Sequence, residues 1–323
     1  MSEYAIGIDL GGTNLKAGLV KRDEGLQTKT SRPTEAAQGP DHVLDRIAAA
    51  AKDLLDEVPE DRVVGIGIGA PGAINWERTT VSQPPNFPGW KDVNMRAALQ
   101  ERLGNGKPVF VGNDANVAGL GSAHYSTGRP YDCFVMVTLG TGVGGAIIYQ
   151  NEIFRGSTGG AGEIGHMTID YEGPVDRSSV AGAIEGYLGQ HFLSRHARYR
   201  LLARSESKIH DIANEDLTDI TPEMLYHAAV DGDKPAKEIL AWAGHKLGCV
   251  LGATANLLDI RTFIIGGGVS QAGRFILEPA RETLVHYVTP ALCDGLRILR
   301  EEQGNDVGLL GAAHLAFQFA GAA

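Results

Sequence analysis

Apolar and polar positions along this chain switch between strand-like and helix-like periods. Short β-branched runs predict strands at 63–69, 107–112, 262–265 and 297–299. Helices are predicted at 41–57, 93–103, 115–126, 181–204, 222–231, 234–258 and 308–319, with a further helix beginning near Gly273. Because strands alternate with helices throughout, the pattern predicts an α/β fold.

One pattern occurs twice. Tyr4–Val20 and Phe134–Tyr149 each contain an apolar run, a tight Gly/Thr turn and a second apolar run, which predicts two strand–turn–strand hairpins. Glycines at such turns let backbone N–H groups converge on an anion. Two similar turns in different parts of one chain predict two halves that hold one polyphosphate.

The repeat also predicts where the chain divides. We expect a small N-terminal α/β domain at 1–113, completed by a C-terminal helix at 308–323, and a larger α/β domain at 114–307. A chain of 323 residues is long enough for two such domains, each with its own core.

Composition narrows the class of protein. Hydrophobic residues make up 43% and charged residues 21%, as in an ordinary globular protein. A net charge of -10 argues against nucleic acid as a partner, because phosphate backbones select basic surfaces. Cys133, Cys249 and Cys293 are too dispersed for a disulfide framework, so we expect a reducing, cytoplasmic setting. We expect no signal peptide and no membrane span.

The first Gly/Thr turn adds charged residues to its glycines. Asp9 next to a phosphate site would be repulsive without a cation between them, which predicts a hydrated Mg²⁺ near Asp9. Lys16 either lies near the phosphates or is a surface lysine on the returning strand. The turn is not a Walker A motif, because no Gly-Lys-Ser/Thr opens a helix here.

Asn113-Asp114 stands where a predicted strand passes into a helix. One interpretation is a helix N-cap. The other is catalytic: Asp114 accepts the proton of a substrate hydroxyl while that oxygen attacks a terminal phosphoryl group.

The segment Gly162–His166 places Glu163 and His166 three residues apart in a glycine-rich loop. Metal ligation, recognition of sugar hydroxyls and plain loop hydrogen bonding all fit this spacing. A polyol needs several donors and acceptors at fixed positions. Asn86, Asn113, Glu163, His166 and Glu185 supply them, although Glu185 alone would be read as an exposed helix residue.

These residues also fall into motifs that resemble the ROK family of sugar kinases and repressors, within the actin/hexokinase-like ATPase superfamily. The resemblance runs nearly end to end. Its donor-side motifs are Asp9–Thr13, Leu139–Gly142 and Ile265–Val269. Its sugar-side motifs are Ala70–Gly72, Pro85–Trp90, Gly112–Asn116 and Glu163–His166. The combination of Pro85–Trp90 with Glu163–His166 is most similar to the bacterial glucokinase branch.

The resemblance implies a two-domain actin/hexokinase-like (ribonuclease H-like) fold with a cleft between the domains, and use of ATP with Mg²⁺. It implies Asp114 as the catalytic base. Residues implied to hold the hexose are Gly72, Asn86, Asn113, Asp114, Glu163, His166 and Glu185. Residues implied to hold the nucleotide are Asp9, Gly11, Gly12, Thr13, Lys16, Thr138, Gly140, Thr141, Gly142, Gly266, Gly267 and Gly268.

The chain departs from the family at one place. Most relatives bind a structural Zn²⁺ through the His of Glu-x-Gly-His and three cysteines just downstream. Here the cysteine positions hold Asp176, Ser178 and Ala183. Since His166 and Asp176 leave only two credible ligands where four are usual, we predict no structural zinc.

The leading hypothesis is an ATP-dependent glucokinase that phosphorylates the 6-hydroxyl of glucose. Alternatives in the same family are N-acetylmannosamine, N-acetylglucosamine, fructose or allose kinases, with polyphosphate as a second possible donor. A sugar-responsive transcriptional regulator is disfavoured by the acidic charge, and because only Met1–Glu3 precedes the first hairpin. By resemblance we expect a homodimer or homotetramer.

Overall fold

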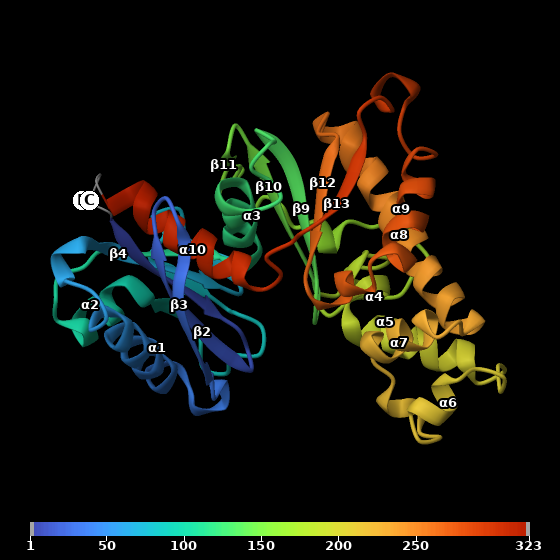
Figure 1. The fold of residues 1–323 in the computed structure, drawn as a ribbon, viewed down its shortest axis with the longest axis horizontal. Helices are drawn as coiled ribbons and strands as arrows, with labels where there is room; N and C mark the ends of the chain where they lie inside the picture. The colour runs from blue at the N-terminus through green and yellow to red at the C-terminus, as the bar shows by residue number, and fades with distance from the viewer. Residues whose placement is uncertain (1–2, 321–323) are drawn as a thin grey trace. The chain divides into compact units, whose positions relative to one another are not determined.

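The computed structural model describes residues 3–320, which form two compact units (Figure 1). The first unit comprises Met1–Cys133, Ala146–Gly162 and Asn305–Ala323. The second comprises Phe134–Gly145 and Glu163–Gly304. Each unit contains a sheet and several helices, so the predicted α/β class is confirmed.

The main sheet of the first unit has the strand order β3-β2-β1-β4-β8. Its strands are β1 (Tyr4–Leu10), β2 (Asn14–Lys21), β3 (Gly25–Pro33), β4 (Val63–Ala70) and β8 (Val109–Asn113). β1, β4 and β8 are parallel, whereas β2 runs antiparallel to both of its neighbours, β1 and β3. The carboxyl ends of β1, β4 and β8 therefore meet at one edge, where open α/β sheets bind ligands.

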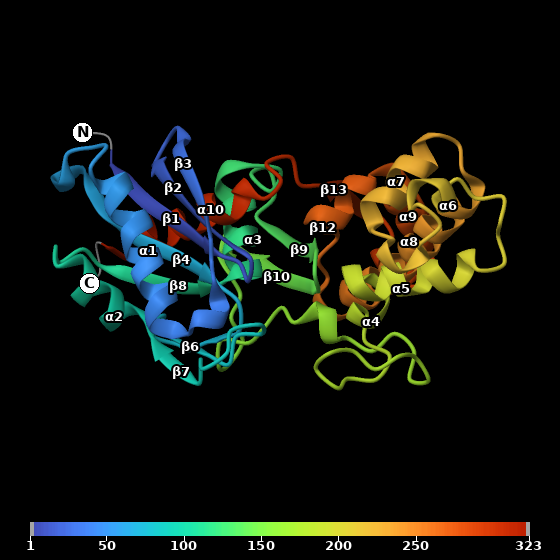
Figure 2. The ribbon, with the colours of Figure 1, turned by 90° about the horizontal axis from the view of Figure 1, so that it is seen from below.

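Helices cover both faces of this sheet (Figures 1 and 2). On one face, Ile6, Ile8 and Leu10 share a core with α1 (Pro40–Leu55) and α2 (Met95–Leu103). On the other, Ala5 shares a second core with α3 (Asp114–Tyr125) and α10 (Asp306–Phe319). The period-2 alternation of β1 divides its side chains between these two cores.

Helix α10 lies directly on the sheet because β1 and β4 present glycine to it. A Cβ added to Gly7 would lie 1.9 Å from the Leu309 carbonyl oxygen, and one added to Gly67 would lie 1.6 Å from that of Ala312. Helices α10 and α3 approach each other just as closely, since a Cβ on Gly311 would lie 1.6 Å from the Val117 carbonyl oxygen.

Shorter elements complete the first unit. A small antiparallel sheet contains β5 (Ala73–Ile74), β6 (Thr80–Ser82) and β7 (Asp92–Asn94). Strand β10 (Val143–Tyr149) pairs with β11 (Glu152–Ile153) through its last residues, and Ile153 packs against the second core. Two 3₁₀ turns span Ala36–Gln38 and Glu60–Arg62.

In the second unit, β12 (Thr262–Gly266) lies between β9 (Cys133–Leu139) and β13 (Arg297–Arg300), and all three are parallel. The helices are α4 (Glu185–Leu188), α5 (Gln190–Leu201), α6 (Ile209–Ile212), α7 (Pro222–Val230), α8 (Lys234–Leu258) and α9 (Arg274–Leu284). Four 3₁₀ turns span Ile164–His166, Leu217–Asp219, Gly268–Ala272 and Pro290–Leu292.

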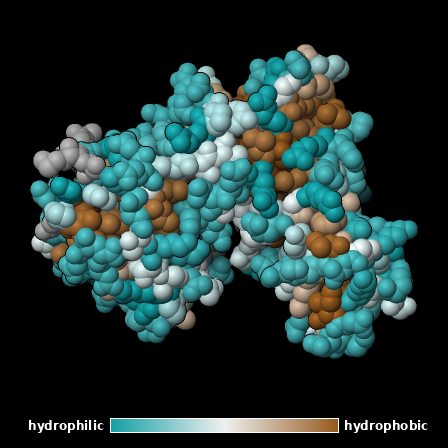
Figure 3. Space-filling view, viewed as in Figure 1, coloured by the Kyte–Doolittle hydropathy of each residue, from teal (hydrophilic) through white to brown (hydrophobic). Residues whose placement is uncertain are grey.

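The surface is largely hydrophilic on the face shown in Figure 3, with a broad hydrophobic area over the upper part of the second unit and smaller ones elsewhere. The described part of that unit exposes several large apolar side chains near the ends of α8 and α9, among them Leu257, Val285 and Tyr287. Among residues 3–320, no helix is both long enough and apolar enough to cross a membrane.

Both hairpins of the repeated pattern form as predicted, β1–β2 around the first turn and β9–β10 around the second. The helix predicted at 181–204 is wrong in extent. Residues 181–184 bond back to the preceding loop, for example from the Ile184 N–H to the Met167 carbonyl, and the extended Gly189 separates α4 from α5. Strand β3 was not predicted, because its alternation is half-exposed and polar.

The observed units differ from the predicted ranges 1–113 and 114–307. Helix α3 and residues 146–162 belong to the first unit, since α3 packs on α10 through Gly121 and Gly311. The C-terminal helix does complete the first unit, as it packs on β1 and β4.

The close helix contact generates a stability prediction. Gly311→Ala should destabilise the protein by roughly 1–3 kcal/mol, because overpacking against the Val117 carbonyl outweighs the gain in helix propensity. Gly308→Ala, on the same helix, is the matched control, because its Cβ would have ordinary contacts of 3.7 Å or more. Urea unfolding measures both, and equal effects of the two substitutions would contradict the close contact.

Candidate active site

The first unit brings its predicted polar residues to the carboxyl edge of the sheet. Asp9, near the end of β1, is paired with Lys16 on β2 and with Gly69 on the parallel strand β4. Directly paired antiparallel residues point to the same face, so the Asp9 carboxylate and the Lys16 ammonium share a side of the hairpin. Asp114 follows the end of β8 on the same edge.

Asp9 lies in an environment that disfavours its charge. Burial, and then the nearby Asp114, raise the pKa of Asp9 from 3.8 to about 6, while Lys16 opposes the increase. A carboxylate held this way gains from a hard cation, and its oxygen donors suit Mg²⁺ that keeps waters and phosphate oxygens as other ligands. The donor set therefore fits the predicted magnesium position near Asp9.

The sequence left open whether Asn113-Asp114 is a helix N-cap or a catalytic site. The structure assigns the N-cap to Asn113. The Asn113 side chain is the N-cap of α3: its Oδ1 accepts from the Asn116 N–H at 3.1 Å, and its Nδ2 donates to the Gly72 carbonyl at 3.4 Å. Asp114 Oδ1 accepts from the Ala115 N–H at 2.8 Å. Burial raises the pKa of Asp114, and hydrogen bonds from the backbone and Asn113 oppose that increase.

The first Gly/Thr turn (Gly11–Thr13), which we predict to bind phosphate and call the first phosphate turn, is held from outside by a residue that sequence reasoning missed. The Thr34 hydroxyl donates to the Gly11 carbonyl at 2.6 Å, and the Thr34 N–H donates to the Thr13 carbonyl at 2.8 Å. Gly12 and Thr13 themselves are exposed. Thr34 is a plain threonine after β3, and no motif marks it in the sequence.

Asn86 is presented on a loop anchored by two aromatic side chains. Phe87 and Trp90 are buried and pack edge to face, with ring centroids 5.3 Å apart. Asn86 is exposed and adopts a left-handed φ of 68°, which asparagine tolerates better than most residues. A Cβ on Gly12 would lie 3.8 Å from the Asn86 Cβ, so Asn86 lies beside the first phosphate turn.

Gly72 supports the same region through its backbone. Its φ is 94°, and a Cβ would lie 2.8 Å from both Pro84 Cα and the Ser82 carbonyl oxygen. Only glycine fits there. The Gly72 carbonyl accepts the hydrogen bond from Asn113 Nδ2. Gly72 therefore supports the site through a carbonyl group and a tight turn.

In the second unit, the two remaining motifs that we predict to bind the nucleotide lie side by side. Thr138 on β9 is the register partner of Gly266 on the parallel strand β12. Gly267 has a φ of 83°, and a Cβ there would lie 2.3 Å from the Leu139 carbonyl oxygen. The exposed Gly268 begins a 3₁₀ turn directly afterwards. Thr138, Gly140–Gly142 and Gly266–Gly268 therefore gather at one end of β9 and β12.

Glu185 does not behave as a lone exposed helix residue. It is the first residue of α4, and its Oε2 accepts from the Val143 N–H at 3.0 Å, directly after Gly142. The Gln190 N–H donates to the Gly140 carbonyl at 2.9 Å. The second phosphate turn is thus bonded to the α4–α5 segment at both of its ends, a link that sequence spacing did not reveal.

Glu163 and His166 lie on the same 3₁₀ turn, with Glu163 Oε2 3.9 Å from His166 Nε2. His166 Nδ1 lies 2.7 Å from Asp176 Oδ2. A carboxylate at Nδ1 favours the tautomer that carries its proton there, which leaves Nε2 for a ligand.

The Asp176 side chain is the hydrogen-bond acceptor that holds the loop after this 3₁₀ turn. This side chain is fully buried, and its Oδ1 accepts from the Ser178 and Val180 N–H groups at 2.8 Å each. Burial alone would raise the pKa of Asp176, but hydrogen bonds from Val180 and His166 hold it below its ordinary value. The sequence analysis treated Asp176 only as a lost cysteine position.

These residues do not fit a structural zinc site. The Asp176 oxygens are already engaged by His166 and by two backbone N–H groups, while Ser178 and Ala183 offer no thiolate. Within residues 3–320, no group of three or more His, Cys, Asp or Glu side chains is arranged to hold a metal ion. The absence of zinc from the protein stays a prediction.

Asp9 generates a pH-dependent prediction. Because its pKa is raised in the folded state, the folded protein binds more protons than the unfolded chain between pH 4 and about 6, and this contribution to stability is lost as pH rises. Asp9→Asn removes the charge, so its stability relative to the parent should be greatest at pH 7. That difference should shrink by up to roughly 3 kcal/mol at pH 4.

Urea unfolding without Mg²⁺ at the two pH values measures the difference. Asp61→Asn, an exposed aspartate of the same unit, is the control and should show no comparable shift. A pH-independent difference for Asp9→Asn would contradict the raised pKa.

Asp176 generates a second prediction. Asp176→Ala should lower the free energy of unfolding by about 2–4 kcal/mol, because two buried N–H groups and His166 lose their acceptor. Asp176→Asn keeps one acceptor oxygen and should be intermediate, while Glu172→Ala in the same loop should have little effect. Metal analysis of the purified parent protein completes the test: stoichiometric zinc would refute this account of the loop.

Comparison with known proteins gives a consistent assignment. The ROK family pattern matches residues 5–318. The glucokinase of Thermotoga maritima is 32% identical over 312 residues, covering 96% of each chain. The glucokinase of Streptomyces coelicolor is 33% identical over 318 residues, again covering 96% of each.

Among solved structures, a ROK family glucokinase from Streptomyces griseus, in complex with glucose and AMPPNP, superposes with a TM-score of 0.86 at 31% identity. That match covers 98% of this chain and 99% of the other. It confirms the predicted two-domain actin-like sugar kinase fold. The family pattern, the curated relatives and the fold agree, and this chain belongs to the ROK family.

Proposed function

We propose that this chain is an ATP-dependent glucokinase that transfers a phosphoryl group to the 6-hydroxyl of glucose. The carrying observation is Asp114, a partly buried carboxyl group at the start of α3, on the same sheet edge as Asp9 and the first Gly/Thr turn. The glucokinases of similar length and fold support the choice of donor and acceptor.

Asp114 is the proposed general base. Asn113 caps α3, so Asp114 is not needed for that purpose and its position is set by the helix. Burial raises the pKa of Asp114 above its ordinary value, which makes the carboxylate a better proton acceptor. The hydroxyl loses its proton as bonding to phosphorus develops, so position contributes more than basicity.

The nucleotide role is assigned residue by residue. Gly11, Gly12 and Thr13 form the first phosphate turn, beside Asp9 and Lys16; Thr138 and Gly140–Gly142 form the second, and Gly266–Gly268 contact the adenosine side. Turns of this kind bind anions through backbone N–H groups, which suits an acidic protein. Mg²⁺ near Asp9 offsets phosphate charge when ATP is bound.

The residues that we propose to bind the sugar supply both hydrogen-bond donors and acceptors for its hydroxyl groups. Asn86 and Asn113 offer amides, Glu163 and Glu185 offer acceptors, His166 offers Nε2, and Gly72 offers backbone. Specificity among hexoses depends on how such a pocket treats the 2-substituent. N-acetylmannosamine, N-acetylglucosamine, fructose and allose are the alternative acceptors, and polyphosphate is the alternative donor.

The remaining assignments belong to the same proposal. We propose a cytoplasmic enzyme that forms a homodimer or homotetramer and binds neither nucleic acid nor membrane. Its three cysteines, each partly buried, are free thiols. The net charge of -10 disfavours a nucleic-acid surface.

The base assignment is tested by Asp114→Asn. Loss of the proton acceptor should lower kcat by on the order of 10²–10⁴-fold while glucose affinity changes little. Coupled ADP release measures turnover and calorimetry measures glucose binding, with Asp61→Asn as the control for an exposed aspartate. A kcat within threefold of the parent value would exclude Asp114 as the base.

The same assay on the parent enzyme tests the acceptor and the donor. Glucose with ATP should give the highest kcat/KM in a panel of the alternative hexoses, with polyphosphate as the second donor. A higher value for another hexose would overturn the choice of glucose and leave the kinase assignment intact.

A further inference from the structure

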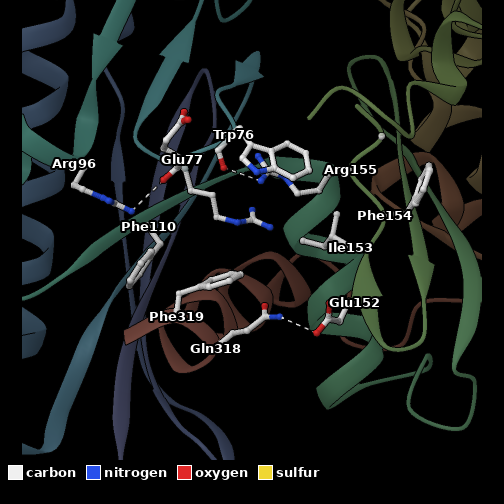
Figure 4. Close-up of a pocket in the computed structure, with 12 residues that line it drawn as sticks. Trp76, Glu77, Arg96, Phe110, Glu152, Ile153, Phe154, Arg155, Gln318 and Phe319 are labelled. Carbon is white, nitrogen blue, oxygen red and sulfur yellow. Dashed lines mark hydrogen bonds between the residues drawn. The ribbon is translucent and has the colours of Figure 1, made fainter. Parts of the chain in front are cut away.

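The first unit contains a cavity that none of the predicted substrate residues lines. Its volume is about 640 Å³, within the range of small-molecule sites. Arg78, Arg96 and Arg155 line it together with Trp76, Phe110 and Phe319. Figure 4 shows Trp76 and Arg155 on one wall, with Phe110 and Phe319 opposite. Three guanidinium groups around one cavity are unexpected in a protein of net charge -10.

Arg78 is held at this cavity in a strained conformation. It lies in the turn between β5 and β6 with a left-handed φ of 57°. Asn75 fixes the turn, since its Oδ1 accepts from the Thr79 N–H at 2.8 Å and the Thr80 N–H at 2.9 Å. The Arg78 carbonyl accepts from the Val111 N–H of β8 at 3.0 Å. Strain of this kind persists where the surrounding structure fixes a residue, often at ligand sites.

The positive charge of the Arg78 guanidinium is also not neutralised by an ion pair within the described residues. Among residues 3–320, no carboxylate forms an ion pair with it; its close contact is the Phe319 ring, 5.1 Å from the guanidinium carbon. Burial, and then the positive charge of Arg155, lower the pKa of Arg78 to about 10, and Glu152 opposes this less strongly. A partly buried charge without a partner costs free energy that a bound anion would recover.

The other two arginines are fixed by the protein. Arg155 donates to the Trp76 carbonyl at 2.8 Å and to the Asn75 carbonyl at 3.0 Å, and lies over the Trp76 ring. Arg96 donates to the Val109 carbonyl at 2.8 Å and lies over the Phe110 ring. Because these acceptors are neutral carbonyl groups, they do not neutralise the positive charges of Arg96 and Arg155. The wall is therefore preorganised, with flat aromatic surfaces beside positive charge.

We propose that this cavity is a second ligand site, which binds a small organic anion, a phosphate or a carboxylate attached to a flat or apolar group, with Arg78 as the main contact. The guanidinium fork matches either anion in a bidentate geometry. The aromatic walls match the apolar part. Glu77 and Glu152, which also line the cavity, limit the total anionic charge that it accepts.

Calorimetry on the full chain tests the site, with AMPPNP, Mg²⁺ and glucose present at saturation so that the proposed active site is occupied. The probes are phenyl phosphate, benzoate, inorganic phosphate and phenol. We expect phenyl phosphate or benzoate to bind, and the more tightly held of the two identifies the head group. Inorganic phosphate and phenol should each bind at least tenfold more weakly, because each lacks one half of the ligand.

Arg78→Gln should weaken binding of the preferred probe at least tenfold and raise the melting temperature of the free protein, because it removes an uncompensated charge. Arg78→Lys keeps the charge but loses the fork, so it should be intermediate. Arg62→Gln, an exposed arginine of the same unit, is the control for net charge. Turnover of glucose and ATP without probe should be unchanged in all three variants.

Three results would overturn the proposal. The first is no binding of phenyl phosphate or benzoate to the parent protein at 10 mM, roughly the weakest affinity of interest for such a small ligand. The second is equal binding by Arg78→Gln. The third is dissociation of an oligomer by Arg78→Gln, which would show that a second copy of the chain covers the cavity.

Discussion

The close contact of α10 with the first sheet determines the environment of the proposed catalytic edge. Gly7 and Gly67 let the helix backbone lie against β1 and β4, where any side chain would collide with a carbonyl oxygen. Asp9 continues the same face of β1, and a Cβ on Gly308 of α10 would lie 3.7 Å from the Asp9 carboxyl carbon. The contact that builds the second core thus also removes water from the carboxyl group.

The burial of the Asp9 and Asp114 carboxyl groups lowers the stability of the folded protein and favours the proposed catalytic role. Burial raises the pKa of both Asp9 and Asp114, and the charge of Asp114 raises the pKa of Asp9 further. Replacing either by a neutral residue relieves this repulsion, whereas a bound cation relieves it without changing the residues. A protein selected only for stability would not place two carboxyl groups here, so the placement itself favours a catalytic purpose.

Sequence patterns predicted the strands that carry this edge, because buried β-branched runs and Gly/Thr turns are local signals. They also predicted the residues of the edge, most of them through family motifs. They did not predict the bonds of Thr34 to Gly11, Glu185 to Val143 or Asp176 to His166, which join residues 10–42 positions apart and follow no period. The helix predicted at 181–204 was wrong for the same reason, since backbone bonds to residues 167–174 competed with helical ones.

The two phosphate turns resemble each other less than the repeated pattern suggests. At the first, the Lys16 ammonium opposes the charge of Asp9 across the hairpin, although burial and Asp114 outweigh its effect. At the second, the Glu185 carboxylate accepts the Val143 N–H and thereby removes one donor from the end of the turn. Since Glu185 also begins α4, any displacement of that helix changes the donors available at the turn. The second turn is therefore coupled to a residue assigned to the sugar, whereas the first is coupled to the assigned base through Asp9.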